Sequence, residues 1–150
     1  MDIIFDIDGT LADCSKRTHY LLQAHKDWNS FYAGMPEDKP ISEMICLLHT
    51  LFNEEIDCEV ANRIVLVTGR PETYMDATKV WLRKNRIYYD ALYMRKADDH
   101  RADDVIKLEL LAVLRKNGYD PKLVFEDRTR VVEMWRAQGL LCCQCASGDF

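Results

Sequence analysis

The stretch Met1–Thr10 reads MDIIFDIDGT, and the rest of the chain is interpreted outward from it. The run Ile3-Ile4-Phe5 is short, apolar and β-prone, which is typical of a strand buried at the centre of a sheet. It leads directly into Asp6 and Asp8, which are two residues apart and would therefore leave an extended strand toward the same side. Gly9-Thr10 then ends the strand with a turn. The sequence thus predicts a pair of acidic side chains at the end of a central strand.

This acidic pair indicates a metal-dependent site. Neighbouring carboxylates repel each other, so one of them holds a proton unless a cation lies between them. A hard divalent cation such as Mg²⁺, which prefers oxygen ligands, would remove the conflict between Asp6 and Asp8. A calcium-binding loop also opens with Asp-x-Asp, but it requires glycine at its sixth position, whereas glycine is fourth here. A solvated turn is the other alternative, but such a turn does not normally follow an apolar strand.

The composition is that of a globular protein, with 48% hydrophobic and 30% charged residues in a chain of 150. This length suits a single domain. No apolar run approaches a membrane span and no export signal is recognisable, so we expect a cytoplasmic location, no membrane association and reduced cysteines. Cys142, Cys143 and Cys145 lack the spacing and the second cluster of a zinc site. The net charge of −5 argues against wrapping long nucleic acid, but allows one phosphorylated end to bind.

Strands and helices alternate along the rest of the chain. Strands are expected at 63–67, 91–94, 123–125 and 140–144, and helices at 28–35, 41–52, 74–85, 103–117 and 129–138, with a short helix around 20–24 and a polar connection over 54–62. Alternation with short connections predicts an α/β fold, with a mainly parallel sheet covered by helices on both faces.

Polar side chains follow three of the predicted strands where those strands end. Asp6 and Asp8 follow the first strand, Thr68 follows the strand at 63–67, and Glu126-Asp127 follows the strand at 123–125. In open α/β sheets the ligand binds outside the carboxyl ends of the strands. We therefore expect these side chains to meet at one edge of the sheet.

Asp103 and Lys107 are four residues apart on the helix expected at 103–117, so they share one face of it. Leucines at 110, 111 and 114 lie close to the same face, which makes it partly inward, and a lysine there needs anionic partners. From the spacing alone, a purely structural Asp–Lys pair is the more frequent explanation.

Four segments now occur in an order that resembles a known set of motifs. They are Asp6-Ile7-Asp8-Gly9-Thr10, Val67-Thr68-Gly69-Arg70, Lys107 and Glu126-Asp127-Arg128, and together they resemble the motifs of the haloacid dehalogenase (HAD) superfamily of phosphotransferases. The segments 101–107 and 131–136, with the tail 147–150, more specifically resemble the 3′-phosphatase domain of the bacteriophage polynucleotide kinase 3′-phosphatase family. The resemblance covers 1–18 and 64–150, and it implies one HAD-like, Rossmann-like domain over 1–150 with a small helical insert at about 14–40 after the first strand.

The resemblance implies a role for each motif residue. Asp6 would be the nucleophile that forms an aspartyl-phosphate, and Asp8 would be the general acid and then the base. Mg²⁺ would be held by Asp6, by the Asp8 carbonyl and by Asp127. Thr68 and Lys107 would bind the oxygens of the phosphoryl group in transfer.

Further residues complete the expected site. Arg17 and Arg70 lie where the family carries functional arginines, which suit bidentate recognition of phosphate. The alternatives are a solvated loop residue for Arg17 and a turn-stabilising role for Arg70. Gly69 and Asp103 are expected on the substrate side. Glu126 stands where the family usually has aspartate, so it could contact the metal directly or through water, and Asp127 is the preferred ligand.

The resulting hypothesis is a Mg²⁺-dependent phosphomonoesterase that removes the 3′-phosphate from nucleic-acid ends. The partner would be a 3′-phosphorylated oligonucleotide or nucleotide, and the location would be the host cytoplasm if a phage encodes the chain. The short insert implies an open site, which favours a substrate with a large body. The chain has no G-x-x-x-x-G-K-[ST] loop, so ATP is not an expected substrate. The sequence does not indicate any particular protein partner.

Two alternatives stay open. One is a phosphatase of free nucleoside monophosphates, a nucleotidase, in which Trp28, Phe31 and Tyr32 would stack on the base. An aromatic stripe at helical spacing is, however, more often a packing feature. The other is a catalytically silent binding module on the same fold, which the intact set of motif residues disfavours.

Overall fold

The computed structural model describes residues 1–52 and 62–148. Most of the expected polar connection at 54–62, together with Cys58 and the last two residues of the tail, therefore lies outside the described residues. The five described cysteines are free thiols. In the part of the chain that the structure describes, no helix is both long enough and apolar enough to span a membrane. The cytoplasmic location stays a prediction.

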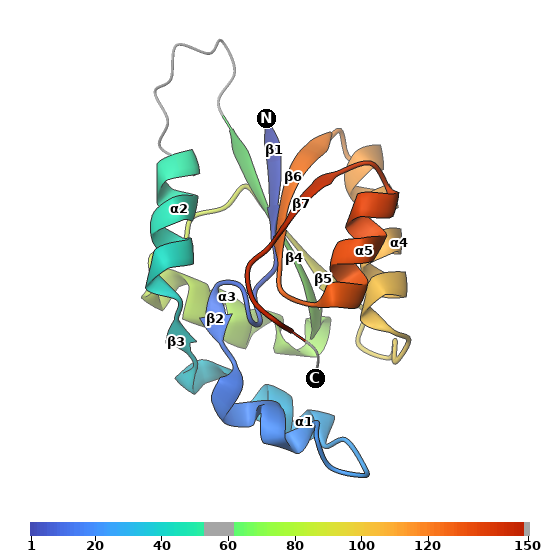
Figure 1. Ribbon diagram of the computed structural model, residues 1–150. Helices are drawn as coiled ribbons and strands as arrows, with labels where there is room; N and C mark the ends of the chain where they lie inside the picture. The colour runs from blue at the N-terminus through green and yellow to red at the C-terminus, as the bar shows by residue number, and fades with distance from the viewer. Residues whose placement is uncertain (53–61, 149–150) are drawn as a thin grey trace.

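A five-stranded parallel sheet forms the centre of the molecule (Figure 1). The strand order is β5-β4-β1-β6-β7, so the first strand lies in the middle. The strands are β1 (Asp2–Phe5), β4 (Arg63–Pro71), β5 (Ala91–Arg95), β6 (Pro121–Glu126) and β7 (Leu141–Gln144). The predicted α/β fold and its parallel sheet are confirmed, and β4 extends through the Thr68-Gly69-Arg70 motif that was expected to follow it.

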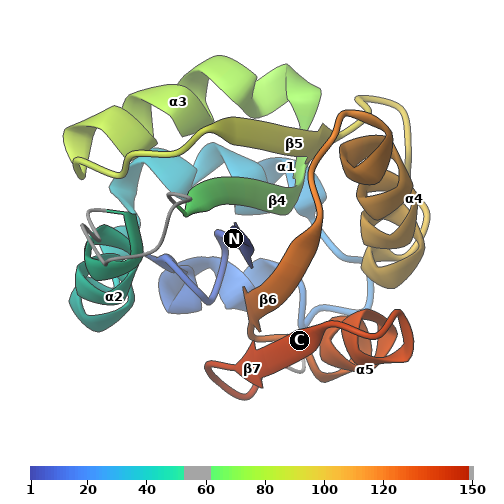
Figure 2. The ribbon, with the colours of Figure 1, turned by 90° about the horizontal axis from the view of Figure 1, so that it is seen from above.

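Helices cover both faces of this sheet, as predicted (Figure 2). On one face lie α2 (Ser42–Phe52) and α3 (Met75–Lys84), the latter preceded by the 3-10 helix η3 (Glu72–Tyr74). On the other face lie α4 (Asp103–Lys116) and α5 (Thr129–Ala137).

In the segment between β1 and α2, residues 12–40 form a small arm closed by a two-stranded antiparallel ribbon, β2 (Ala12–Asp13) with β3 (Lys39–Pro40). It contains α1 (Trp28–Ala33) and the 3-10 helices η1 (Ser15–Tyr20) and η2 (Met35–Glu37). The Asp27 side chain caps α1 by accepting a hydrogen bond from the Ser30 amide at 3.0 Å. The arm has a cluster of its own, made of Leu21, Phe31, Tyr32 and Met35.

The helix expected around 20–24 is absent, and that expectation was wrong. The chain forms η1 instead, just before this segment, and then turns. Leu21 is buried, but the neighbouring Leu22 is 71% exposed. The two leucines therefore do not build one apolar face, and a short helix without such a face is not stable by itself.

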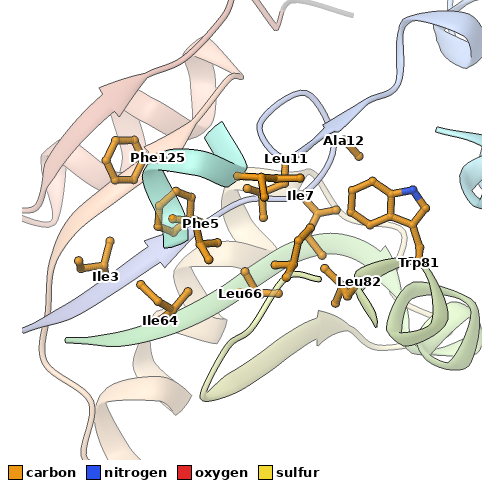
Figure 3. Packing of buried hydrophobic residues seen from close by; sticks show 13 residues of the cluster. Ile3, Phe5, Ile7, Leu11, Ala12, Ile64, Leu66, Trp81, Leu82 and Phe125 are labelled. Atoms are coloured by element: carbon orange, nitrogen blue, oxygen red, sulfur yellow. The ribbon is translucent and has the colours of Figure 1, made fainter. Parts of the chain in front are cut away.

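The apolar run of β1 is continuous because the strand packs against an apolar layer on each face of the sheet. Ile3 and Phe5 point to the layer with α2 and α3, where Phe5 stacks on Phe125 with ring centroids 4.6 Å apart (Figure 3). Ile4 points to the other layer, with Leu114 and Trp135. Since both faces of the strand are buried, the polar residues that follow it stand out at the edge of the sheet.

The packing of α4 against the sheet gives a first prediction. Replacement of the fully buried Leu114 by alanine should lower the free energy of unfolding by about 2–5 kcal/mol, because it removes buried methyl groups and leaves a cavity. Urea denaturation measures this change. The neighbouring Val113 is 47% exposed, so Val113→Ala is the matched control, with an expected change within about 0.5 kcal/mol. Equal losses for both variants would contradict this description of the helix.

Candidate active site

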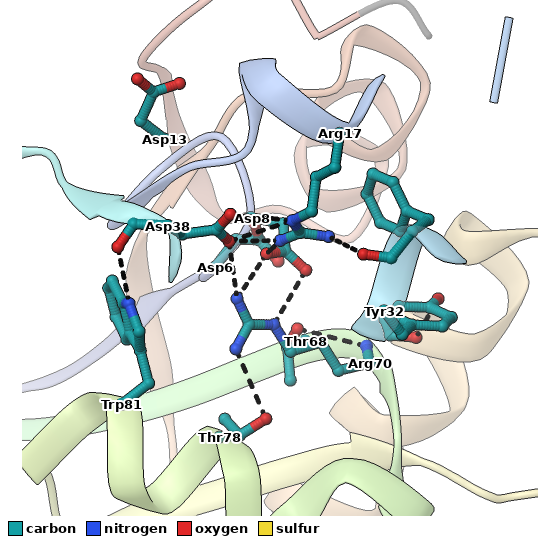
Figure 4. Close-up of polar contacts among 12 residues, drawn as sticks. Asp6, Asp8, Asp13, Arg17, Tyr32, Asp38, Thr68, Arg70, Thr78 and Trp81 are labelled. Carbon is teal, nitrogen blue, oxygen red and sulfur yellow. Dashed lines mark hydrogen bonds and ion pairs between the residues drawn. The ribbon is translucent and has the colours of Figure 1, made fainter. Parts of the chain in front are cut away.

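The carboxyl ends of β1, β4 and β6 surround one small pocket, as the strand-end argument predicts. Helix α4 adds side chains from one side, and the arm around α1 adds aromatic rings from another. The predicted site residues that line the pocket are Asp6, Asp8, Thr68, Gly69, Asp103, Lys107, Glu126 and Asp127. The predicted Arg17 and Arg70 lie just behind it, against Asp8 (Figure 4).

Lys107 is the buried cation of this pocket, with only 1% of its surface exposed. Its Nζ donates to Asp6 Oδ1 at 2.6 Å and to Glu126 Oε2 at 2.7 Å, and it lies 3.4 Å from Asp103 Oδ2. Burial alone would lower the pKa of Lys107, but the carboxylates of Asp103, Asp6 and Glu126 raise it well above its usual value. Lys107 therefore stays charged. The structural ion pair between Lys107 and Asp103 is present, and Lys107 also makes two shorter contacts, to Asp6 and to Glu126.

Asp6, Glu126 and Asp127 form an acidic trio whose ligand oxygens all lie within 4.8 Å of one another. Burial raises the pKa of Asp6 well above its usual value, and repulsion by Glu126 and Asp127 adds to this, although Lys107 opposes it. Burial and Glu126 likewise raise the pKa of Asp127 to about 8. One Lys107 ammonium therefore does not balance the trio.

The acidic trio fits a hard divalent cation. Asp127 Oδ1 is buried and lacks a hydrogen-bond partner among the described residues. A buried carboxylate oxygen without a partner is costly, and Mg²⁺ supplies both the missing contact and the missing charge. The residues that could hold it are the predicted Asp6, Asp127 and Glu126, with Glu126 already engaged by Lys107 through one oxygen.

Two glycines allow the backbone to approach Asp127 from two sides. Gly9 has φ of +88°, and a Cβ on it would lie 2.1 Å from Asp127 Oδ2. A Cβ on Gly148 would lie 2.4 Å from the same oxygen. Any side chain at either position would thus displace the carboxylate. Gly9 belongs to the motif recognised in the sequence, whereas the approach of Gly148 depends on the return of the chain after β7.

The sequence predicts one cation between the side chains of Asp6 and Asp8, but the side chain of Asp8 pairs with two arginines instead. Arg70 Nε donates to Asp8 Oδ2 at 2.9 Å and Arg70 Nη2 to Oδ1 at 2.6 Å, while Arg17 Nη2 also donates to Oδ1 (Figure 4). The side chain of Asp8 is not part of the acidic trio. The reason is that β1 ends at Phe5, so the alternation of side chains along a strand does not extend to Asp8, which lies in a tight turn.

The two arginines decide the charge of Asp8. Burial would raise the pKa of Asp8, but attraction by Arg70 and Arg17 outweighs burial and lowers the pKa well below its usual range. Arg17 and Arg70 are 3% and 0% exposed, so the alternative of a solvated Arg17 was wrong. Asp8 is therefore ionised in this state of the pocket.

Asp38 completes this network, and the sequence analysis did not single it out. Arg17 Nε donates to Asp38 Oδ1 at 2.9 Å, and Arg17 Nη2 donates to Oδ2 at 2.6 Å. The backbone carbonyl of Asp38 accepts a hydrogen bond from Trp81 Nε1 at 2.9 Å. Two buried arginines beside one aspartate require a second acid, and this requirement is the signal that could have pointed to Asp38.

Arg95 also escaped the sequence analysis. It fixes the outer wall by donating from Nε to the Gly69 carbonyl at 2.8 Å and from Nη2 to Asp103 Oδ1 at 3.1 Å. A Cβ on Gly69 would lie 2.3 Å from the same Asp103 oxygen, so only glycine admits this contact. Gly69 and Asp103, both expected on the substrate side, are thus brought against each other at the rim of the pocket.

The acidic trio predicts that Mg²⁺ binding releases protons. The pKa values of Asp6 and Asp127 are raised, and metal ligands must be deprotonated, so the affinity for Mg²⁺ should increase as the pH rises toward about 8 and then level off. Calorimetric titration in two buffers with different ionisation enthalpies measures the affinity and the protons released. Asp127→Asn should weaken binding and reduce proton release. Equal affinity at low and high pH without proton release would contradict this assignment.

The arginine network predicts that Asp38 stabilises the fold. Asp38→Asn leaves the Arg17 guanidinium with a neutral partner, and loss of a hydrogen-bonded charge should lower the free energy of unfolding by about 1–3 kcal/mol. Urea denaturation is again the measurement. Glu37 is the exposed neighbour, so Glu37→Gln is the matched control and should unfold like the wild type. Wild-type stability of Asp38→Asn would show that the pair contributes nothing.

The chain is similar to several known proteins. The profile of the family described as "Polynucleotide kinase PNKP phosphatase domain" matches residues 1–150. A predicted bifunctional polynucleotide kinase/RNA ligase of Autographa californica nuclear polyhedrosis virus is 30% identical over 138 residues, which are 89% of this chain and 17% of the viral protein.

Solved structures extend the comparison. A chain of the Pnkp1/Rnl/Hen1 RNA repair complex is 29% identical, with a TM-score of 0.82 over 99% of this chain and 43% of that one. A haloacid dehalogenase-like hydrolase of Streptococcus pneumoniae, 14% identical, matches 95% of this chain and 83% of that one with a TM-score of 0.62, which shows the fold alone. This chain thus spans less than half the length of the viral protein and of the repair-complex chain.

Proposed function

This chain belongs to the family of HAD-type polynucleotide kinase phosphatase domains, and from this membership we propose that it is a Mg²⁺-dependent phosphomonoesterase acting on the 3′-phosphate ends of nucleic acids. One observation carries the proposal. A buried nucleophile candidate, Asp6, shares its pocket with the Lys107 ammonium, with Glu126 and Asp127, which together with Asp6 could hold a metal ion, and with Asp8, a further acid held by arginines. Cleavage of a phosphate ester requires these parts: a nucleophile, positive charge and a proton donor.

In the first step, an oxygen of Asp6 attacks phosphorus while the bond from phosphorus to the 3′ oxygen breaks. Lys107 holds Asp6 in place and contributes positive charge beside the transferring group, where the hydroxyl of Thr68 also lines the pocket. Mg²⁺, held by Asp6, Asp127, Glu126 and the Asp8 carbonyl, would neutralise negative charge of the phosphoryl group and of the acidic trio.

Asp8 would move the proton in both steps. The arginines keep it ionised before substrate binds, and we infer that the negative charge of the bound phosphate raises its pKa, so that Asp8 takes up a proton from water and passes it to the leaving 3′ oxygen. In the second step the ionised Asp8 accepts a proton from water, and that water attacks the aspartyl-phosphate. The bond from Asp6 to phosphorus then breaks and inorganic phosphate leaves.

A nucleotidase acting on free nucleoside monophosphates is the second candidate. The observation that favours it is the presence of Trp28, Phe31 and Tyr32 in the lining of the pocket, where they could contact a base. Phe31 and Tyr32 are nevertheless buried in the cluster of the arm, as the packing interpretation expects. Comparing kcat/KM for a 3′-phosphorylated oligonucleotide and for mononucleotides separates the two candidates, and preference for mononucleotides would favour the second.

The relatives also suggest a partner. The names of the viral relative and of the RNA repair complex combine a polynucleotide kinase with a ligase or with further proteins. Removal of a 3′-phosphate leaves the 3′-hydroxyl that end joining requires, so we propose a nucleic acid ligase as the enzyme class that consumes the product. We also propose a cytoplasmic location, where the free thiols would stay reduced.

Asp6 provides the direct test. Asp6→Asn should lower the release of phosphate from a 3′-phosphorylated oligonucleotide by roughly 10³-fold or more, because the covalent route disappears with the nucleophile. The measurement is phosphate release at saturating Mg²⁺. Asp13 is a nearby carboxylate that does not line the pocket, and Asp13→Asn should retain wild-type turnover. Activity near wild type in Asp6→Asn, or full activity after exhaustive chelation, would overturn the proposal.

A further inference from the structure

We propose that the groove beside Trp28 binds the terminal nucleotide of the substrate strand, with the base of that nucleotide stacked on the Trp28 ring. This inference rests on the proposed function, because it places the body of a nucleic-acid end whose phosphate lies at Asp6. It adds a base-recognition site, which the reaction chemistry by itself does not require.

The groove is continuous with the catalytic pocket. The two share Trp28, Tyr32, Arg95, Asp103 and Arg128 in their linings. From this shared rim the groove extends between α1 and η3 on one side and the segment before α4 with the start of α5 on the other. A group joined to a phosphate in the pocket therefore has a path out along this groove.

Three aromatic rings form a row along one wall of the groove. Trp28 stacks on Tyr32 with centroids 5.8 Å apart and an angle of 23° between the ring planes, and Tyr32 lies 5.2 Å from Tyr74. The Tyr32 hydroxyl donates to the Gly69 carbonyl at 3.3 Å, which connects this row to the catalytic strand β4. This hydrogen bond thus attaches the row of rings to the sheet.

Trp28 differs from the other rings of α1 in its exposure. Phe31 and Tyr32 are buried and account for the packing of the arm, whereas Trp28 is 39% exposed at the rim shared by pocket and groove. An isolated exposed aromatic residue would need no explanation. This one stands on a rigid support beside the pocket, and a flat ring in that place is a platform for a nucleobase, since every base has a π face.

The charge of the groove suits a polyanion. Its lining contains five basic side chains, Lys26, Arg95, Arg101, Arg128 and Arg130, against three acidic ones, Asp99, Asp103 and Asp104. The chain as a whole carries a net charge of −5, so this surplus of positive charge is local. Aromatic rings together with basic side chains are the combination that binds single-stranded nucleic acid, through bases and phosphates respectively.

The test compares two single-stranded DNA substrates that carry the same 3′-phosphate. One ends in a normal nucleotide, and the other ends in an abasic sugar. The measured quantity is the ratio of kcat/KM for the two substrates. Loss of stacking on one base corresponds to about 1–3 kcal/mol, so Trp28→Ala should reduce this ratio roughly 5- to 150-fold. Tyr88, an exposed aromatic residue that lines neither the pocket nor the groove, provides the matched control, and Tyr88→Ala should keep the wild-type ratio.

A binding measurement separates failure of this inference from failure of the proposed function. Fluorescence anisotropy of a labelled single strand with a 3′-hydroxyl needs no turnover, and Trp28→Ala should weaken its binding relative to Tyr88→Ala. If the wild type hydrolyses neither substrate but this difference in binding appears, the proposed function fails and the base platform stands. If both substrates are hydrolysed and Trp28→Ala leaves both the ratio and the binding unchanged, the base platform is overturned.

Discussion

The structure depends on one buried ammonium group. Lys107 reaches from α4 to Asp6 at the end of β1 and to Glu126 at the end of β6, so a single side chain joins a helix to two neighbouring strands. A buried charge is tolerated only where opposite charges and hydrogen bonds compensate for lost hydration. The compensation here contains more carboxylates than Lys107 can balance, which disfavours ionisation of Asp6 unless a cation binds beside it. The same charged side chains therefore hold the helix to the sheet and form the candidate active site.

A second charge cluster lies beside the first and is balanced differently. Asp8 and Asp38 face two arginines, so that cluster is complete without a metal ion. The contrast gives different electrostatic surroundings to two aspartates that are only two residues apart in the sequence. Asp6 lies where the surplus of negative charge disfavours its ionisation, whereas Asp8 lies where arginines favour it. A nucleophile must be ionised and a general acid must carry a proton, so Asp6 would need a bound cation, and Asp8 would need a change of its surroundings, before they could act in these roles.

The sequence was sufficient for the sheet, the helices on both faces and the strand ends that gather around the pocket, because these depend on local periodicity and on the geometry of parallel sheets. It was insufficient where distant segments meet. Asp38 pairs with an arginine 21 residues away, and Gly148 approaches Asp127 only after the chain has formed its last strand. The side chain of Asp8 also departed from strand alternation, because a turn begins before it. Local sequence patterns cannot predict any of these contacts.

The bridge from Arg17 to Asp8 connects two parts of the chain that also meet where the Tyr32 hydroxyl donates to the Gly69 carbonyl and where Trp81 donates to the Asp38 carbonyl. Arg17 and Asp38 both belong to the arm between β1 and α2, whereas Asp8 and Arg70 belong to the sheet edge. A side chain of the arm therefore supplies part of the positive charge that keeps Asp8 ionised. The charge state of an acid at the sheet edge thus depends on the correct folding of a segment outside the sheet.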